Sequence, residues 1–197
     1  MAEVIEQANG ETWQLYNSDC VEGLRGLHAD SVDFGIHSPP FSNLYIYSDS
    51  ERDMGNCATD EEFFRHYRFA IDEMLRVTVP GRLCGVHCKD LPKYANVYGV
   101  TGLIDFPGAI IQEFESAGWT YHSRVTIWKC PVIERERTNN NGLLHKTVKR
   151  DRSQVRQGMA DYLLLFRKPP SADAGLMSDK PIATNGFDRY IGTLDPR

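Results

Sequence analysis

The chain has 197 residues, which is enough for one domain with a hydrophobic core. Its hydrophobic content of 41% and charged content of 25% are ordinary for a globular protein, and no segment approaches the roughly 18 apolar residues that span a bilayer. The net charge of −5 argues against attraction to nucleic acid across the whole surface.

Apolar segments between breakers predict a regular order of elements. Strands are expected at residues 13–16, 32–37, 82–88, 119–128 and 161–166. Helices are expected at residues 21–27, 60–78 and 107–117. Asn17, Ser18 or Asp19 can cap the first helix, Asp60 can cap the second, and Gly118 can end the third in a left-handed conformation.

Alternating strands and helices predict a parallel sheet with covering helices, an α/β fold. The last two strands have no predicted helix between them, because residues 131–158 read as a polar loop. We therefore expect these two strands to form an antiparallel pair at the sheet edge, with the long connection as a functional excursion.

The cysteines indicate a reducing compartment. There are five of them, widely spaced and odd in number, so a disulfide framework is not expected. Cys84 and Cys88 lack a second ligand pair, so no metal site is predicted. The first twelve residues have no apolar signal segment, and a cytoplasmic protein without membrane contact is expected.

The strongest chemical signal is Ser38-Pro39-Pro40-Phe41, directly after the apolar strand predicted at residues 32–37. Two prolines cannot donate to a sheet ladder, so the strand ends there. Ligands of open α/β sheets bind beyond the carboxyl ends of strands, which places a candidate site at this tetrapeptide. The alternative is a rigid exit from the strand. His87 and Asp90 end the neighbouring predicted strand, where they either line the same pocket or form a turn.

The tetrapeptide resembles the catalytic motif of the amino-methyltransferases, Asp/Asn/Ser-Pro-Pro-Tyr/Phe/Trp. Residues 13–168 as a whole resemble the N-terminal part of the bacterial and phage DNA N-4/N-6 methylase family, with support from Asp19-Cys20-Val21-Glu22-Gly23-Leu24 and from Arg156-Gln157-Gly158-Met159. The resemblance implies a partial Rossmann-like sheet of an S-adenosylmethionine (SAM)-dependent methyltransferase. The implied reaction moves a methyl group from SAM to an exocyclic amine of cytosine (N4) or adenine (N6) in DNA.

The resemblance also implies roles for individual residues. Ser38 Oγ and the Pro39 carbonyl would accept hydrogen bonds from the amine, Pro40 would fix the backbone, and Phe41 would stack on a base flipped out of double-stranded DNA. Serine at the first position leans towards cytosine N4. Asp19 and Cys20 would lie near the adenine of SAM, although Asp19 is equally well explained as a helix cap.

A basic segment lies on an otherwise acidic chain. Residues 124–156 hold nine basic and three acidic residues, so they carry +6 and the rest carries −11. The segment is either a solvated loop or a cationic surface for a polyanion. With the family resemblance, residues 131–160 become a target-recognition insertion. The candidate DNA-binding residues are Arg135, Arg137, Lys146, Lys149, Arg150, Arg152 and Arg156.

The glycine loop with which the family binds SAM, Phe/Asp-x-Gly-x-Gly, is not found in the sequence. Residues 1–168 are therefore predicted to be the catalytic half of a methyltransferase domain, and residues 169–197 a loop-like segment leading to a missing cofactor half. Such a chain would be inactive alone and would expose an apolar edge at residues 32–37. Its partner would be a second copy or the missing C-terminal half. The alternative is a non-catalytic DNA-binding or partner subunit complemented by another chain.

Overall fold

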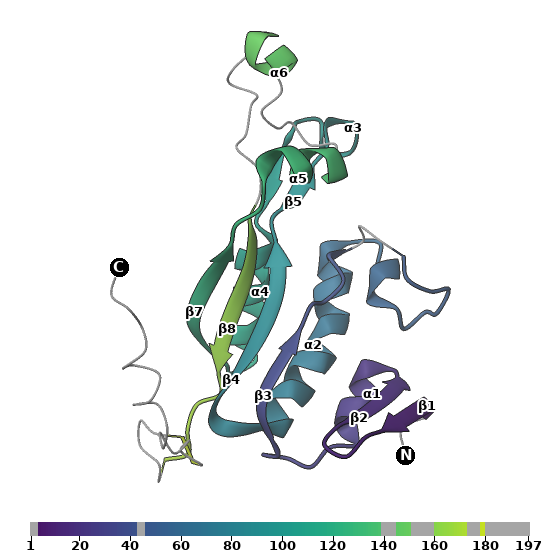
Figure 1. Cartoon of the computed structure of the whole chain (residues 1–197), viewed down its shortest axis with the longest axis vertical. Helices are drawn as coiled ribbons and strands as arrows, with labels where there is room; N and C mark the ends of the chain where they lie inside the picture. Colours follow the sequence, from purple (N-terminus) through teal and green to yellow (C-terminus); the bar gives the residue numbers. More distant parts are fainter. Residues whose placement is uncertain (1–3, 43–45, 139–144, 151–159, 173–177, 180–197) are drawn as a thin grey trace.

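The computed structural model describes residues 4–42, 46–138, 145–150, 160–172 and 178–179. Its centre is a four-stranded sheet in the order β3-β4-β8-β7 (Figure 1). The strands are β3 (Val32–His37), β4 (Thr78–Lys89), β8 (Asp161–Arg167) and β7 (Thr120–Ile127). β3 pairs with β4 in parallel, and β8 is antiparallel to both of its neighbours. The predicted antiparallel pair at the sheet edge is confirmed.

Helices α2 (Asp60–Val77) and α4 (Phe106–Ser116) cover one face of this sheet (Figure 1). Their buried aromatic side chains form the core with the strands, as where Phe114 stacks on Phe166 at 4.1 Å between ring centroids. The cap of α2 is Thr59 rather than the expected Asp60, because the Thr59 hydroxyl accepts from the Glu62 N–H at 3.2 Å. Gly118, with φ of 102°, follows the end of α4 as predicted.

Smaller elements surround the sheet. They are β1 (Val4–Asn9), β2 (Gln14–Ser18), α1 (Cys20–Arg25), η2 (Met54–Asn56), β5 (Leu91–Lys93), α3 (Ala95–Tyr98), β6 (Gly102–Ile104), α5 (Pro131–Thr138) and α6 (His145–Arg150). β1 pairs with β2 and β5 with β6, both antiparallel. The prediction that the long connection between the last two strands lacks helices was wrong, because α5 and α6 lie within it.

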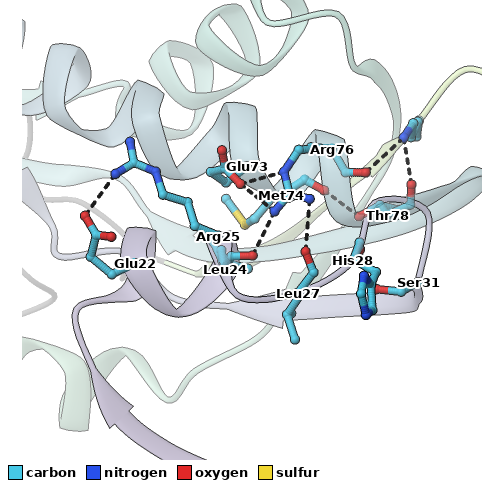
Figure 2. Close-up of polar contacts among 11 residues, drawn as sticks. Glu22, Leu24, Arg25, Leu27, His28, Ser31, Glu73, Met74, Arg76 and Thr78 are labelled. Atoms are coloured by element: carbon cyan, nitrogen blue, oxygen red, sulfur yellow. Dashed lines mark hydrogen bonds and ion pairs between the residues drawn. The ribbon is translucent and has the colours of Figure 1, made fainter. Parts of the chain in front are cut away.

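The α2–β4 junction is tied to its neighbours by hydrogen bonds from charged side chains to backbone carbonyls (Figure 2). The Arg76 guanidinium donates to the carbonyls of Leu24 and Leu27 at 2.9 and 3.0 Å, so it caps the C-terminal end of α1. Lys168 donates to the Thr78 carbonyl at 2.8 Å. α2 therefore runs directly into β4 at Thr78, and the expected break at Pro80-Gly81 falls inside the strand.

The other sheet face is apolar and open to solvent over much of its area. A Cβ atom on Gly85 would lie 3.3 to 3.5 Å from Leu163, Leu165 and Phe34, so these side chains share this face. Phe34 and Ile36 are 51% and 63% exposed. Within the described part of the chain, β3 has a hydrogen-bonded neighbour on one side only. The expectation of a buried strand was wrong for these two side chains, whereas the exposed apolar edge expected for a partial sheet is present. None of the described helices is long and apolar enough to cross a membrane.

Candidate active site

Polar side chains from several strands meet at one end of the sheet. β3 and β4 are parallel and carry Ser38 and His87 at or near their carboxyl ends. β8 runs the opposite way, so its first residue, Asp161, lies opposite Lys89 at the end of β4. β7 ends at the same level, with Ile127 opposite Asp161. The reversal of β8 thus adds residues from the C-terminal part of the chain to the predicted site.

The Ser38-Pro39-Pro40-Phe41 turn is held rigidly while its serine stays accessible. Ser38 is exposed and Pro39 is buried. Phe41 packs edge-on against Phe106, with 6.3 Å between ring centroids. Ser42, which follows the turn, has a positive φ of 52°, is buried, and hydrogen-bonds the Asp60 carboxylate. These contacts therefore fix the turn that carries Ser38.

A series of polar contacts leads away from this hydroxyl. Ser38 Oγ lies 3.3 Å from His87 Nδ1 and 3.2 Å from the His87 carbonyl oxygen. His87 Nε2 lies 2.8 Å from Asp161 Oδ2, which also pairs with Lys129 Nζ at 2.5 Å. His87 therefore lines the same site as Ser38, which was the first of the two interpretations offered for it. Asp90 lies in the link between β4 and β5.

Sequence reasoning missed Asp161 and Lys129 as site residues. Asp161 was expected only as the first residue of a strand, and Lys129 only as one of the basic residues of the segment. The signal that could have placed them is the antiparallel pairing itself, since it brings the end of β7 and the start of β8 together.

A buried ion pair attaches α5 to the same end of the sheet. Lys89 Nζ lies 3.0 Å from Glu134 Oε1, and the two side chains are 9% and 3% exposed. Glu134 Oε2 lies 3.9 Å from Lys129. Lys89 also lies 6.0 Å from the centre of the Phe41 ring. The first helix of the predicted recognition insertion is therefore bound to the site by buried charges.

β3 is fixed to the helical layer immediately before the motif. His37 Nε2 and the Tyr67 hydroxyl are 2.7 Å apart. Burial lowers the pKa of His37 to about 4, and burial raises the pKa of Tyr67 well above its usual value. Both groups are therefore neutral near pH 7 and form a neutral hydrogen bond. This bond holds the strand whose next residue is Ser38.

Two grooves meet near the motif at Cys20 and Met54, which line both. The larger, about 410 Å³, is mainly apolar and reaches Ser38 and Pro39. The smaller, about 270 Å³, has charged side chains in its lining, among them Asp19 and Arg52. These dimensions suit an elongated ligand with apolar and polar parts.

The predicted cofactor-contacting residues line these grooves. The Asp19 carboxylate accepts from the backbone N–H groups of Val21 and Glu22 at 3.0 and 3.1 Å, which confirms its role as a helix cap. It also pairs with Arg52 at 3.4 Å. A cofactor contact by Asp19 or Cys20 therefore stays a prediction.

The predicted DNA-binding residues divide between two short helices and the rest of the insertion. Arg135 and Arg137 belong to α5, and Lys146, Lys149 and Arg150 to α6. Lys149 and Arg150 are exposed. Arg152 and Arg156 lie outside the described residues, as does most of the expected C-terminal segment.

The fold is that of a SAM-dependent methyltransferase, as comparison with solved structures shows. A protein from Thermus thermophilus named as a 'putative DNA modification methylase' superposes with a TM-score of 0.54 at 17% identity, over 88% of this chain and 62% of its own. The same protein complexed with SAM gives a TM-score of 0.53, over 87% of this chain and 61% of its own.

The cytosine-N4-specific PvuII DNA methyltransferase superposes with a TM-score of 0.50 at 14% identity, over 79% of this chain and 50% of its own. This chain thus spans about half to three-fifths of the length of these proteins. No protein-family model and no curated protein sequence matches it. The shared fold confirms the predicted partial methyltransferase sheet.

Proposed function

We propose that this chain carries the base-amine site of a SAM-dependent DNA methyltransferase that acts on N4 of cytosine or N6 of adenine. The observation that carries the proposal is the accessible Ser38 hydroxyl in a rigid Ser-Pro-Pro-Phe turn at the carboxyl end of β3. In a methyltransferase-like sheet, this position is where a ligand is expected.

The reaction needs the protein mainly to position the amine relative to the methyl donor. The lone pair of an exocyclic amine is delocalised into the base, so the amine is a weak nucleophile. Hydrogen bonds from the amine to Ser38 Oγ and to the Pro39 carbonyl would localise that lone pair and aim it. SAM, when bound, supplies an electrophilic methyl group. Phe41 borders the site and offers a ring surface towards a flipped base.

Further strands are proposed to complete the sheet beside β3. Phe34 and Ile36 on this strand are exposed apolar residues at an edge without a neighbour among the described strands. Unpaired strand edges of this kind readily pair with another segment. The completing segment is a C-terminal half or a second chain, and it would supply the glycine loop that binds SAM. Methyl transfer is proposed to need this segment.

DNA is the proposed substrate because the basic insertion starts at the site. α5 is anchored by Glu134 to Lys89, which lies 6.0 Å from the centre of the Phe41 ring, and α6 exposes Lys149 and Arg150. Basic side chains of this insertion would contact phosphates and set the position of the duplex. Replacing Lys149 and Arg150 together should weaken DNA binding and make it less salt-dependent.

The test is methyl transfer from labelled SAM to DNA by the protein together with the segment that completes the sheet. Ser38→Ala should lower kcat by about 10²- to 10³-fold, as removal of one preorganised hydrogen-bond partner does. Ser31→Ala is the matched control, because the Ser31 hydroxyl donates to the nearby His28 carbonyl at the opposite end of β3. Undiminished activity of Ser38→Ala would remove Ser38 from its proposed role.

The second candidate is a non-catalytic DNA-binding subunit. It becomes the better description if the completed wild-type protein binds DNA but transfers no methyl group to it.

A further inference from the structure

Ser38 is a weaker hydrogen-bond acceptor than a carboxylate would be in the same place. A hydroxyl becomes a better acceptor when its own proton is donated onward, because hydrogen bonds in series polarise one another. A serine at this position therefore works best with an acceptor behind it.

The structure supplies that acceptor from the neighbouring strand. The single proton of Ser38 Oγ has two acceptors in reach, His87 Nδ1 at 3.3 Å and the His87 carbonyl at 3.2 Å. Both contacts are longer than the usual 2.7–2.8 Å of a hydroxyl bond, so neither locks the proton. The hydroxyl is left free to turn when an amine arrives.

Asp161 determines which nitrogen of His87 is available. A carboxylate accepts hydrogen bonds, so the 2.8 Å contact to Asp161 Oδ2 requires the proton of neutral His87 to be on Nε2. Nδ1 then carries a lone pair directed at Ser38. Lys129, 2.5 Å from the same Asp161 oxygen, helps to hold this carboxylate in place.

We infer that His87, oriented by Asp161, accepts the proton that Ser38 passes on from the methylated amine. This inference rests on the proposed function. Because His87 reaches the base only through Ser38, it is a positioning residue for the serine as well as the terminal proton acceptor. Asp161 in turn positions His87.

The methyl transfer and the proton transfers that follow it conserve atoms and charge. The amine nitrogen forms a bond to the methyl carbon as the carbon–sulfur bond breaks, and that electron pair stays on sulfur. The nitrogen, now positively charged, gives one proton to Ser38 Oγ. Ser38 gives its own hydroxyl proton to His87 Nδ1. The imidazolium, paired with Asp161, later releases its proton to solvent.

The first experiment uses the chain itself and does not depend on methyl transfer. Nitrogen-15 NMR of labelled histidine reports which ring nitrogen is protonated, and His87→Asn identifies the resonances of His87. We expect neutral His87 to have a protonated Nε2 and an unprotonated Nδ1. Asp161→Asn should mix the two tautomers. His122, an exposed histidine 2.9 Å from Ser123 Oγ, is the internal control and should not change.

A proton on Nδ1 of neutral His87 in the wild type would overturn the inference, because the ring could not then accept from Ser38. An unchanged tautomer in Asp161→Asn would overturn the role of Asp161.

The second experiment measures DNA methylation by the completed protein. His87→Asn keeps a hydrogen-bond acceptor but cannot take up a proton, so kcat should fall by about 10²-fold or more, with KM for DNA within about twofold. His122→Asn should match the wild type. Full activity of His87→Asn beside an active wild type would refute the proton transfer while the proposed function stands. An inactive wild type would count against the proposed function, and the NMR result would still decide the tautomer on which the relay depends.

Discussion

The buried pair of Lys89 and Glu134 gives the sharpest stability prediction. The side chains are 9% and 3% exposed with 3.0 Å between charged atoms, so water screens them little. Removing one member of a buried pair costs about 3–5 kcal/mol, mainly because the other charge stays buried without compensation. Replacing both members with apolar residues of similar size costs far less.

The two single substitutions should differ. After Lys89→Met, Glu134 still has Lys129 at 3.9 Å. The free energy of unfolding should therefore fall by an amount near the lower limit, about 3 kcal/mol. After Glu134→Leu, Lys89 loses the one carboxylate that pairs with it among the described residues, so the cost should be near the upper limit of about 5 kcal/mol. The double substitution should cost about 1 kcal/mol or less.

The assay is urea unfolding of the four proteins, combined with hydrogen exchange of the α5 amides. Exchange is needed because α5 can detach without unfolding of the sheet, which would limit the apparent global cost. Arg65→Met is the control, because its pair with Glu62 is exposed and should contribute about 0–0.5 kcal/mol. If Glu134→Leu costs under about 1 kcal/mol and leaves α5 exchange unchanged, the pair does not anchor this helix.

Three further predictions concern the frame of the site. Arg76→Met should lower the free energy of unfolding by about 2 kcal/mol through two lost bonds from a charged donor. Arg25→Met, which removes an exposed pair, should leave urea titrations nearly unchanged. The pKa of His37 is about 4 against about 6.5 when unfolded, so the unfolded state binds more protons between these values and stability falls by about 3 kcal/mol as pH drops through this window. His37→Gln should lose that part of the pH dependence, and an unchanged slope would contradict the assignment. Ile36→Thr should reduce self-association in sedimentation velocity without loss of stability, because Ile36 is 63% exposed; equal association in both proteins would show that the β3 edge is not the contact.

The sequence was sufficient for the features that depend on local pattern. β3 was predicted at its observed bounds because an apolar run is followed by two prolines, and α2 because its apolar residues recur on one face. β1 and the β5–β6 ribbon were missed, since their sequences are polar or very short. α5 and α6 were missed because short polar helices without an apolar stripe resemble loops.

The site itself was only half predictable. Ser38 was identified because a rare tetrapeptide carries it, and His87 because it ends the adjacent strand. Asp161 and Lys129 are 123 and 91 residues further along the chain than Ser38, and only the register of β8 between β4 and β7 brings them to it. Long-range register of this kind depends on tertiary packing rather than on local sequence.

The position of the insertion would let the proposed DNA recognition and the proposed chemistry share one site. The connection from β7 to β8 leaves the sheet after Ile127 and returns at Asp161, two residues that face each other in the pairing. Lys129, just after the exit, binds Asp161 at the return, so the two ends of the insertion are held together by an ion pair at the site. The insertion can therefore vary in length or sequence between these two residues without displacing the carboxylate that orients His87. Glu134 adds a second attachment through Lys89, which limits how far α5 can move from Ser38.

A substitution beyond residue 138 should accordingly change which DNA is bound, whereas Lys129→Met should alter the tautomer of His87 through Asp161. Unaltered His87 nitrogen resonances in Lys129→Met would show that Asp161 is held by the sheet alone.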